Sequence, residues 1–155
     1  MKREVYVYLD NIRSAHNVGS VFRTADGAGV CKVILGGYTP APIDRFGRTQ
    51  PEINKTSLGA CEYIPWQSLD DVAGAEELRC LQNKGFSVVA VEQSASAISL
   101  HELVVPNKVV YIFGNETDGV SNGLLDLSDT VVEIPMHGQK ESLNVAVTAG
   151  VILFH

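Results

Sequence analysis

Closely paired cysteines are absent from this sequence. Its three cysteines, Cys31, Cys61 and Cys80, are widely spaced, and no two of them form a Cys-x-x-Cys pair. A structural zinc site needs about four ligands at short, paired spacing. The sequence therefore predicts no metal site, and it favours buried or partly buried free thiols.

Long hydrophobic runs are also absent. No apolar stretch reaches the roughly 18 residues that a membrane-spanning helix needs. The first ten residues, MKREVYVYLD, pass directly from charged residues to a strand-like alternation, which is not typical of a signal peptide. We therefore expect a cytoplasmic protein that does not associate with membranes.

Four common nucleotide-binding and catalytic motifs are missing as well. The sequence has neither the Gly-x-Gly-x-x-Gly of a dinucleotide fold nor the Gly-rich Lys motif of a phosphate-binding loop. It also lacks the Gly-x-Ser-x-Gly of a nucleophile elbow and the His-Glu-x-x-His of a metalloprotease. These absences disfavour the common nucleotide-binding, serine hydrolase and zinc protease classes.

Positive charge is scarce overall and unevenly distributed. The net charge is −6, which argues against indiscriminate binding to nucleic acid. Residues 1–55 nevertheless hold eight basic and five acidic side chains, a net charge of +3, while the remainder carries −9. The distribution favours a confined anion site in the first third of the chain, although chance fluctuation is an alternative explanation.

Strand and helix patterns alternate along the 155 residues. We predict strands at 4–9, 32–35, 63–66, 86–92, 108–113 and 130–134, from β-rich or apolar runs. We predict helices from an Asn17 cap to Gly27 or Gly29, at 68–84 with Ser68 as cap, at 121–127 and at 143–154. Residues 36–57 are expected to form a long functional loop or a partly ordered insertion. The alternation predicts an α/β fold, a mostly parallel sheet with helices on both faces, in one domain spanning 1–155.

Three polar, glycine-containing loops follow predicted strands, at residues 10–29, 113–121 and 134–144. Ligands of parallel α/β sheets gather at the carboxyl ends of the strands. Each loop alone is a weak indication, and GNETDG by itself resembles an ordinary surface turn. Together they predict one shared site.

In this order, the three loops resemble the motifs of the SpoU/TrmH family of SPOUT methyltransferases. The first motif is matched by Asn17, Gly19, Arg23, Thr24 and Ala25, and the second by Phe113, Gly114, Glu116 and Gly119. The third is matched by Ile134, Pro135, Met136, Gly138, Ser142, Leu143, Asn144 and Val145. The resemblance extends over practically the whole chain.

The resemblance implies a fold with a deep C-terminal trefoil knot, the SPOUT or α/β-knot fold, that binds S-adenosylmethionine. The uncharged stretch from Ser142 to His155 would then be core and homodimer interface, together with the first helix. Two departures accompany it. Ala146 stands where relatives often have serine, and we expect no separate N-terminal RNA-binding domain.

The family's cofactor-binding positions, transferred residue by residue, lie in the second and third loops. They are Phe113, Gly114, Asn115, Glu116, Gly119, Ile134, Met136, Gly138, Ser142, Leu143 and Asn144. The catalytic positions that the resemblance implies are Arg23, Asn17, Glu116, Ser142 and Asn144. The RNA contacts that we expect are Arg13, His16, Arg45, Arg48 and Lys55.

Arg23 and His16 are rival candidates for handling the proton of the acceptor hydroxyl. Taking a proton from a guanidinium group at pH 7 costs roughly 7–9 kcal/mol. We therefore expect Arg23 to contact phosphate and stabilise a developing alkoxide. His16 is a rival base, and it is also a plausible helix-cap or loop residue. Glu116 is expected either to hold the second loop in shape or to pair with Arg23.

The implied reaction is methyl transfer from S-adenosylmethionine to a ribose 2′-hydroxyl of tRNA or rRNA, without a metal. One alternative is a SPOUT enzyme that methylates bases. A second is a non-catalytic RNA-binding protein that retains the fold. A third is an enzyme acting on a small molecule, which only the acidic net charge supports.

Overall fold

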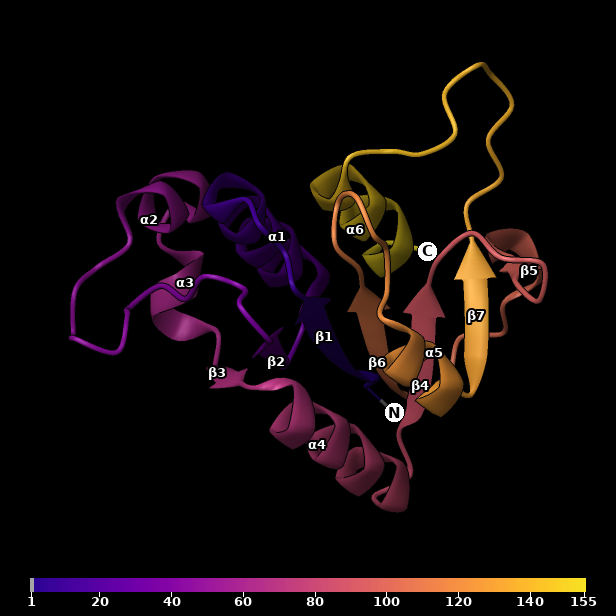
Figure 1. Ribbon diagram of the computed structural model, residues 1–155, viewed down its shortest axis with the longest axis horizontal. Helices are drawn as coiled ribbons and strands as arrows, with labels where there is room; N and C mark the ends of the chain where they lie inside the picture. The colour runs from indigo at the N-terminus through magenta and orange to yellow at the C-terminus, as the bar shows by residue number, and fades with distance from the viewer. Residues whose placement is uncertain (1) are drawn as a thin grey trace.

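The computed structural model describes residues 2–155 and contains a seven-stranded sheet in the order β3-β2-β1-β6-β4-β7-β5 (Figure 1). Each of the six strand pairings in this sheet is parallel. The strands are β1 (Glu4–Asp10), β2 (Lys32–Gly36), β3 (Trp66–Leu69), β4 (Ser87–Val91), β5 (Ile98–Ser99), β6 (Lys108–Phe113) and β7 (Thr130–Glu133). The helices are α1 (Ala15–Ala28), α2 (Pro51–Ser57), α3 (Ala60–Tyr63), α4 (Asp71–Asn83), α5 (Asn122–Leu127) and α6 (Val145–Leu153), with a 3-10 turn, η1, at Leu100–Glu102.

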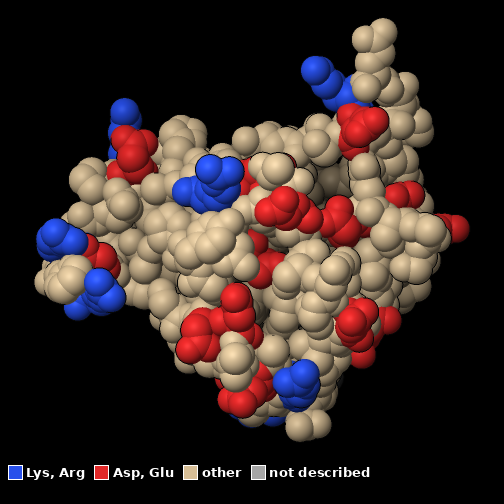
Figure 2. All heavy atoms as spheres, viewed as in Figure 1, with Lys and Arg blue, Asp and Glu red and all other residues tan. Residues whose placement is uncertain are grey.

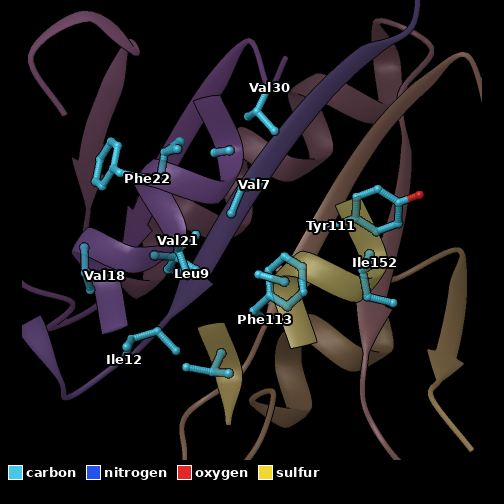
Figure 3. Close-up of a cluster of buried hydrophobic side chains, with 14 of the residues drawn as sticks. Val7, Leu9, Ile12, Val18, Val21, Phe22, Val30, Tyr111, Phe113 and Ile152 are labelled. Carbon is cyan, nitrogen blue, oxygen red and sulfur yellow. The ribbon is translucent and has the colours of Figure 1, made fainter. Parts of the chain in front are cut away.

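Helices cover both faces of the sheet. Successive strand residues point to opposite faces, so Val7 and Leu9 of β1 belong to one core and Tyr8 to the other. The first core contains side chains of α1, α2, α3 and α6, and the second contains those of α4 and α5. Figure 3 shows residues of α1 and α6 meeting those of β1 and β6 in the first core. The predicted parallel α/β sheet with helices on both faces is thereby confirmed.

Two predicted helix starts are wrong. Asn17 does not cap α1, because the Ser14 hydroxyl accepts a hydrogen bond from the Asn17 N–H and the helix begins at Ala15. Ser68 does not cap α4, because Ser68 belongs to β3. The Asp70 carboxylate instead accepts from the Ala73 N–H. Gly29 ends α1 as expected, with a φ of +73° that glycine adopts easily.

The predicted strand at 63–66 is wrong in its position. Residues 60–63 form α3, and the strand β3 begins only at Trp66, where it pairs with Val33 of β2. The predicted loop at 36–57 also includes α2, whose first residue, Pro51, has the φ that a helix start requires. The short elements β5 and η1 were not predicted at all.

The last helix begins at Val145, two residues later than predicted, with Asn144 as its cap. α6 packs in the same core as α1 although about 120 residues separate them in sequence. Within residues 2–155, no helix combines the length and the hydropathy needed to cross a bilayer. The trefoil knot and the single-domain organisation stay predictions.

The parallel arrangement brings the carboxyl ends of β1, β4, β6 and β7 to one edge of the sheet (Figure 1). The segments that follow β1, β6 and β7 are the three polar loops singled out by the sequence. The fold therefore assembles these loops, with the segment after β4, into one neighbourhood.

Candidate functional site

A cleft of about 420 Å³ opens at this edge of the sheet. Its volume lies within the roughly 300–1,000 Å³ typical of small-molecule sites. The residues that line it come from the ends of β4, β6 and β7, the loops after them, and the start of α6. They are Val91, Glu92, Gln93, Phe113, Gly114, Asn115, Glu116, Thr117, Gly119, Glu133, Ile134, Met136, Ser142, Leu143, Asn144, Val145 and Thr148.

The charge of this lining is entirely of one sign. Glu92, Glu116 and Glu133 line the cleft, and among residues 2–155 it receives no lysine, arginine or histidine. Figure 2 shows Asp and Glu spheres gathered over the middle of the face on which these loops lie. A cleft of this kind repels phosphate and favours a ligand that carries positive charge.

Three side chains from the three loops form a hydrogen-bonded chain beside the cleft. The Asn144 side-chain amide donates to the Asn17 side-chain oxygen at 3.3 Å. The Asn17 amide in turn donates to Glu116 Oε1 at 3.4 Å. Asn144 also accepts from the Ala146 N–H at 2.8 Å and so begins α6. One residue from each family motif is thus held in contact with the next.

Glu116 fixes the second loop against the first. Its two carboxylate oxygens accept from the backbone N–H groups of Arg13, at 3.1 Å, and Ser14, at 3.3 Å. Partial burial alone would raise the pKa of Glu116, but these hydrogen bonds and the one from Asn17 outweigh it and lower that pKa. Of the two roles expected for Glu116, the structure supports holding the loop. The pairing with Arg23 is not formed among the described residues.

The buried Asn115 joins the second loop to the first and to the segment after β2. Its amide donates to the Asn11 carbonyl at 2.7 Å and to the Tyr38 hydroxyl at 2.8 Å. Its side-chain oxygen accepts from the N–H groups of Thr117 and Asp118. The turn is also tight, because any side chain at Gly114 would overlap the backbone of Gly119 and Val120, which follow in the same loop. These contacts give the second loop one defined shape.

The sequence predicted most of the cleft's lining. Ten of the eleven cofactor-binding candidates line it, and the remaining one, Gly138, lines an adjoining pocket with Met136 and Gln139. Among the catalytic candidates, Glu116, Ser142 and Asn144 line the cleft, and Asn17 is bonded to two of these.

Arg23 is the exception among the catalytic candidates. It is exposed in the middle of α1 and is not part of the cleft's lining. Its neighbour Thr24 lies beside Gly150 of α6, so Arg23 flanks the contact between the two helices. The structure does not bring Arg23 into the cleft of the same chain.

The candidate RNA contacts all lie on the side of the molecule formed by α1, α2 and the segment between β2 and α2 (Figure 1). All five side chains are exposed: Arg13, His16, Arg45, Arg48 and Lys55. His16 lies in the first turn of α1, where its backbone carbonyl accepts from the Ser20 and Thr56 hydroxyl groups.

The segment after β4 was not among the predicted site loops. Glu92 accepts from the Val120 N–H at 2.8 Å and from the Gln93 N–H at 2.9 Å. It therefore joins the second loop to the segment after β4. Gln93 donates to the backbone of Glu141 in the third loop. A polar pair directly after an apolar strand, at residues 92–93, was the available indication of this fourth loop.

The family model of the SpoU rRNA Methylase family matches residues 4–154. The chain is 34% identical over 145 residues to the 23S rRNA (guanosine-2'-O-)-methyltransferase RlmB of Neisseria meningitidis, covering 94% of this chain and 54% of that protein. It superposes on the AdoMet-bound rRNA methyltransferase of Sinorhizobium meliloti with a TM-score of 0.85 and 29% identity, over 99% of this chain and 56% of that one. A structure described as giving insights into the 2-OH methylation of C/U34 on tRNA matches with a TM-score of 0.79 and 25% identity, over 98% and 93% of the two chains.

The chain therefore belongs to the SpoU rRNA Methylase family, as its three motifs had indicated. It spans about half the length of the curated RlmB relatives that it matches. Within residues 2–155, no three His, Cys, Asp or Glu side chains are grouped as metal ligands would be.

Proposed function

We propose that this protein transfers a methyl group from S-adenosylmethionine to a ribose 2′-hydroxyl of rRNA or tRNA. The observation that carries the proposal is an acidic cleft lined by the second and third family motifs, with Asn17 of the first motif hydrogen-bonded to Glu116 and Asn144 beside it. Relatives that cover nearly the whole chain are named as 2′-O-methyltransferases of 23S rRNA and of tRNA. An RNA substrate of this kind implies action in the cytoplasm.

The cleft's residues fit S-adenosylmethionine by charge and by shape. The sulfonium and ammonium groups of this cofactor outnumber its carboxylate, so a lining with three glutamates and no cation suits it. Ile134, Met136 and Leu143 offer an apolar wall for the adenine ring. When bound, S-adenosylmethionine supplies an electrophilic methyl group and loses its positive charge as that group departs.

The chain's own residues hold the three loops in the fixed arrangement that such a reaction needs. Glu116, Asn17 and Asn144 fix the three loops relative to one another, so the acceptor ribose meets a preorganised surface. Ser142 and Asn144 border the cleft and are placed to contact the ribose. A bound cofactor and ribose would displace water from the apolar wall, which favours a step in which charge is lost.

In this proposal, Arg23 acts at the cleft of a second copy of the chain. It lies outside the cleft of its own chain, on α1 beside the contact with α6. The outer face of α6 leaves Val147, Val151 and Phe154 exposed, at 53%, 40% and 65%. We infer a homodimer through α1 and α6 that buries this apolar face. In it, the partner's guanidinium would contact phosphate and stabilise the developing alkoxide.

The reaction is tested by incubating the purified protein with total RNA and methyl-labelled S-adenosylmethionine. We expect label in 2′-O-methylated nucleosides after nuclease digestion, and the loss of the same site in RNA from a deletion strain. Label recovered in a methylated base would identify a base methyltransferase instead. A wild-type chain that binds no S-adenosylmethionine in calorimetry would contradict the proposal altogether.

The shared site is tested by mixing two inactive variants. Arg23→Ala keeps its cleft, and Gly114→Val keeps its Arg23. If Arg23 acts across the dimer, a heterodimer contains one complete site, and mixing restores part of the activity. If Arg23 acts within its own chain, no heterodimer has a complete site, and the mixture stays inactive.

A further inference from the structure

An ordered basic hairpin projects from the segment between β2 and α2. Ile43 and Thr49 form an antiparallel bridge, and the Asp44 N–H donates to the Arg48 carbonyl at 2.9 Å. Gly47 closes the turn with a φ of +78°. We call residues 43–49 the tip hairpin. In Figure 1 its segment projects away from the sheet at the left, and in Figure 2 Lys and Arg spheres gather at the same place.

The Asp44 carboxylate organises this tip. One of its oxygens accepts from the N–H groups of Phe46, at 2.8 Å, and Arg48, at 2.9 Å. The other accepts from Arg48 Nε at 2.8 Å. The hydrogen bond from the Arg48 backbone, with the others, lowers the pKa of Asp44, so the carboxylate is ionised at neutral pH. The tip hairpin is therefore preorganised although it lies in solvent.

This organisation holds an aromatic ring in water. The Phe46 side chain is 65% exposed. The guanidinium carbons of Arg45 and Arg48 lie 4.8 and 4.9 Å from the centroid of its ring, within cation–π range. Arg48 uses its Nε for Asp44, which leaves its terminal N–H groups available. An exposed aromatic ring and two cations are thus presented together.

An exposed aromatic ring beside arginines matches the chemistry of single-stranded nucleic acid. Unpaired bases stack on aromatic side chains whatever their identity, while arginines contact the flanking phosphates. A protein partner would need carboxylates opposite both arginines and an apolar pocket for a single ring. The net charge of the tip hairpin is +1 on a chain of −6, which favours a polyanion.

The tip hairpin also lies within reach of the cleft. Tyr38, which starts the same segment, accepts a hydrogen bond from Asn115 in the cleft's wall. Ile43 is five positions after Tyr38 in the sequence, and five residues span at most about 18 Å. A strand of RNA whose ribose enters the cleft can therefore meet the tip hairpin a few nucleotides away.

We propose that Phe46 stacks on an unpaired base of the RNA substrate while Arg45 and Arg48 contact its neighbouring phosphates. The tip hairpin then selects single-stranded over paired RNA next to the methylated nucleotide. The inference rests on the proposed function, since it takes RNA to be the substrate. It adds a residue that contributes to specificity and lies outside the family motifs.

A tryptophan at the tip reports stacking directly. Trp66, partly buried in β3, is the chain's only tryptophan and provides the background. The probes are a mixed-sequence RNA strand of about 12 nucleotides, within the site sizes of single-strand binders, and the same strand annealed to its complement. We expect the single strand to quench the indole fluorescence of Phe46→Trp and the duplex to leave it unchanged.

Affinity for the single strand provides the second measurement. Phe46→Ala should weaken binding by roughly 5- to 150-fold, the effect of losing one stacked base. Phe46→Leu should lose nearly as much, because it keeps an apolar side chain without a flat ring. Arg45→Gln should reduce the salt dependence of log Kd by about 0.7 for one lost phosphate contact, which Phe46→Ala should not do. Tyr63→Ala is the matched control, since Tyr63 is 62% exposed on α3 and, among residues 2–155, no arginine lies over its ring.

The outcomes separate this inference from the proposed function. A wild-type chain that neither binds nor methylates RNA refutes both. A wild-type chain that methylates RNA, with Phe46→Ala binding the single strand equally well and no quenching in Phe46→Trp, refutes the stacking role alone. Loss of self-association in Phe46→Ala, with RNA affinity unchanged, would identify the ring as a protein contact and also refute the inference.

Discussion

The side chains of Asn17 and Asn144, 127 positions apart in the sequence, meet at 3.3 Å beside the cleft. Asn144 is at the same time the cap of α6, because its oxygen accepts from the Ala146 and Val147 N–H groups. The start of the last helix is therefore defined by a residue that also borders the ligand cleft. One amide group thus caps α6 and lines the cleft.

Two substitutions of Asn144 separate these roles. Asn144→Ala should lower the free energy of unfolding by about 0.5–2 kcal/mol, because it removes the helix cap. Asn144→Asp keeps an accepting oxygen for the cap but cannot donate to Asn17. We expect near-normal stability in urea denaturation and weaker S-adenosylmethionine binding in calorimetry for Asn144→Asp. Equal loss of stability in both variants would show that the contact with Asn17 matters more than the cap.

Glu116 predicts an acid-sensitive step in stability. Its pKa is lowered in the folded chain relative to its ordinary value of 4.5. Unfolded chains therefore bind its proton first, and the stabilisation is present above about pH 4.5 and is lost as the pH falls through the lower folded pKa. We expect the free energy of unfolding of Glu116→Gln to fall less steeply than that of wild type below pH 5. Parallel pH profiles for the two proteins would contradict this.

Gly114 predicts a steric limit in the second loop. A methyl group at this position would overlap the backbone of Gly119 and Val120. We expect Gly114→Ala to cost about 1–3 kcal/mol of stability, as overpacking does, and to weaken cofactor binding. Gly123→Ala in α5 is the control, since its methyl group would meet no atom within 4 Å. That variant should be unchanged or slightly more stable.

Arg23 and His16 predict different kinetic effects. Loss of one charge-stabilising donor typically costs about 10²–10³-fold in rate, so Arg23→Ala should lose that much while binding the cofactor normally. Arg23→Lys should recover little, because a point charge does not reproduce a planar fork. His16→Ala should cost less than about tenfold, and the acid limb of the pH–rate profile should persist. An equally inactive His16→Ala that still binds RNA and cofactor would make His16 the base.

A substitution at Val147 tests the predicted homodimer. It is 53% exposed on the outer face of α6, so Val147→Asp should leave the single chain folded. We expect sedimentation equilibrium to show a dimer for wild type and a monomer for this variant. Val104→Asp, at a position that is 88% exposed between η1 and β6, should stay dimeric. A wild-type chain that is monomeric at micromolar concentration would refute the dimer.

The sequence was most informative where patterns were long or motifs specific. The strand at Lys108–Phe113 was predicted to the residue, because five consecutive apolar residues between Lys108 and Gly114 leave little choice. The helix caps were less predictable, since Ser14 and Asn17 are both good caps and only tertiary contacts decide between them. β5 pairs only two residues with β7, too few for a periodic pattern to reveal.

Within the site, the same difference holds between local and distant contacts. The motif residues of the cleft were predicted because they follow one another along the chain in the order of the family's motifs. Glu92 was missed because its role, support of the Val120 N–H, depends on β4 lying beside β6. The position of Arg23 outside the cleft could not be read from the motif that contains it, because helix α1 turns that side chain outward.

The hydrogen bond from Asn115 to the Tyr38 hydroxyl connects the wall of the cleft with the segment that leads to the tip hairpin. In the proposed function, a ligand bound at one end of this contact raises the affinity for a ligand at the other end. Thermodynamic reciprocity then requires that RNA tighten the cofactor by the same factor by which the cofactor tightens RNA. The concentration of S-adenosylmethionine would then affect the affinity of the protein for RNA, through a contact made by the Tyr38 hydroxyl.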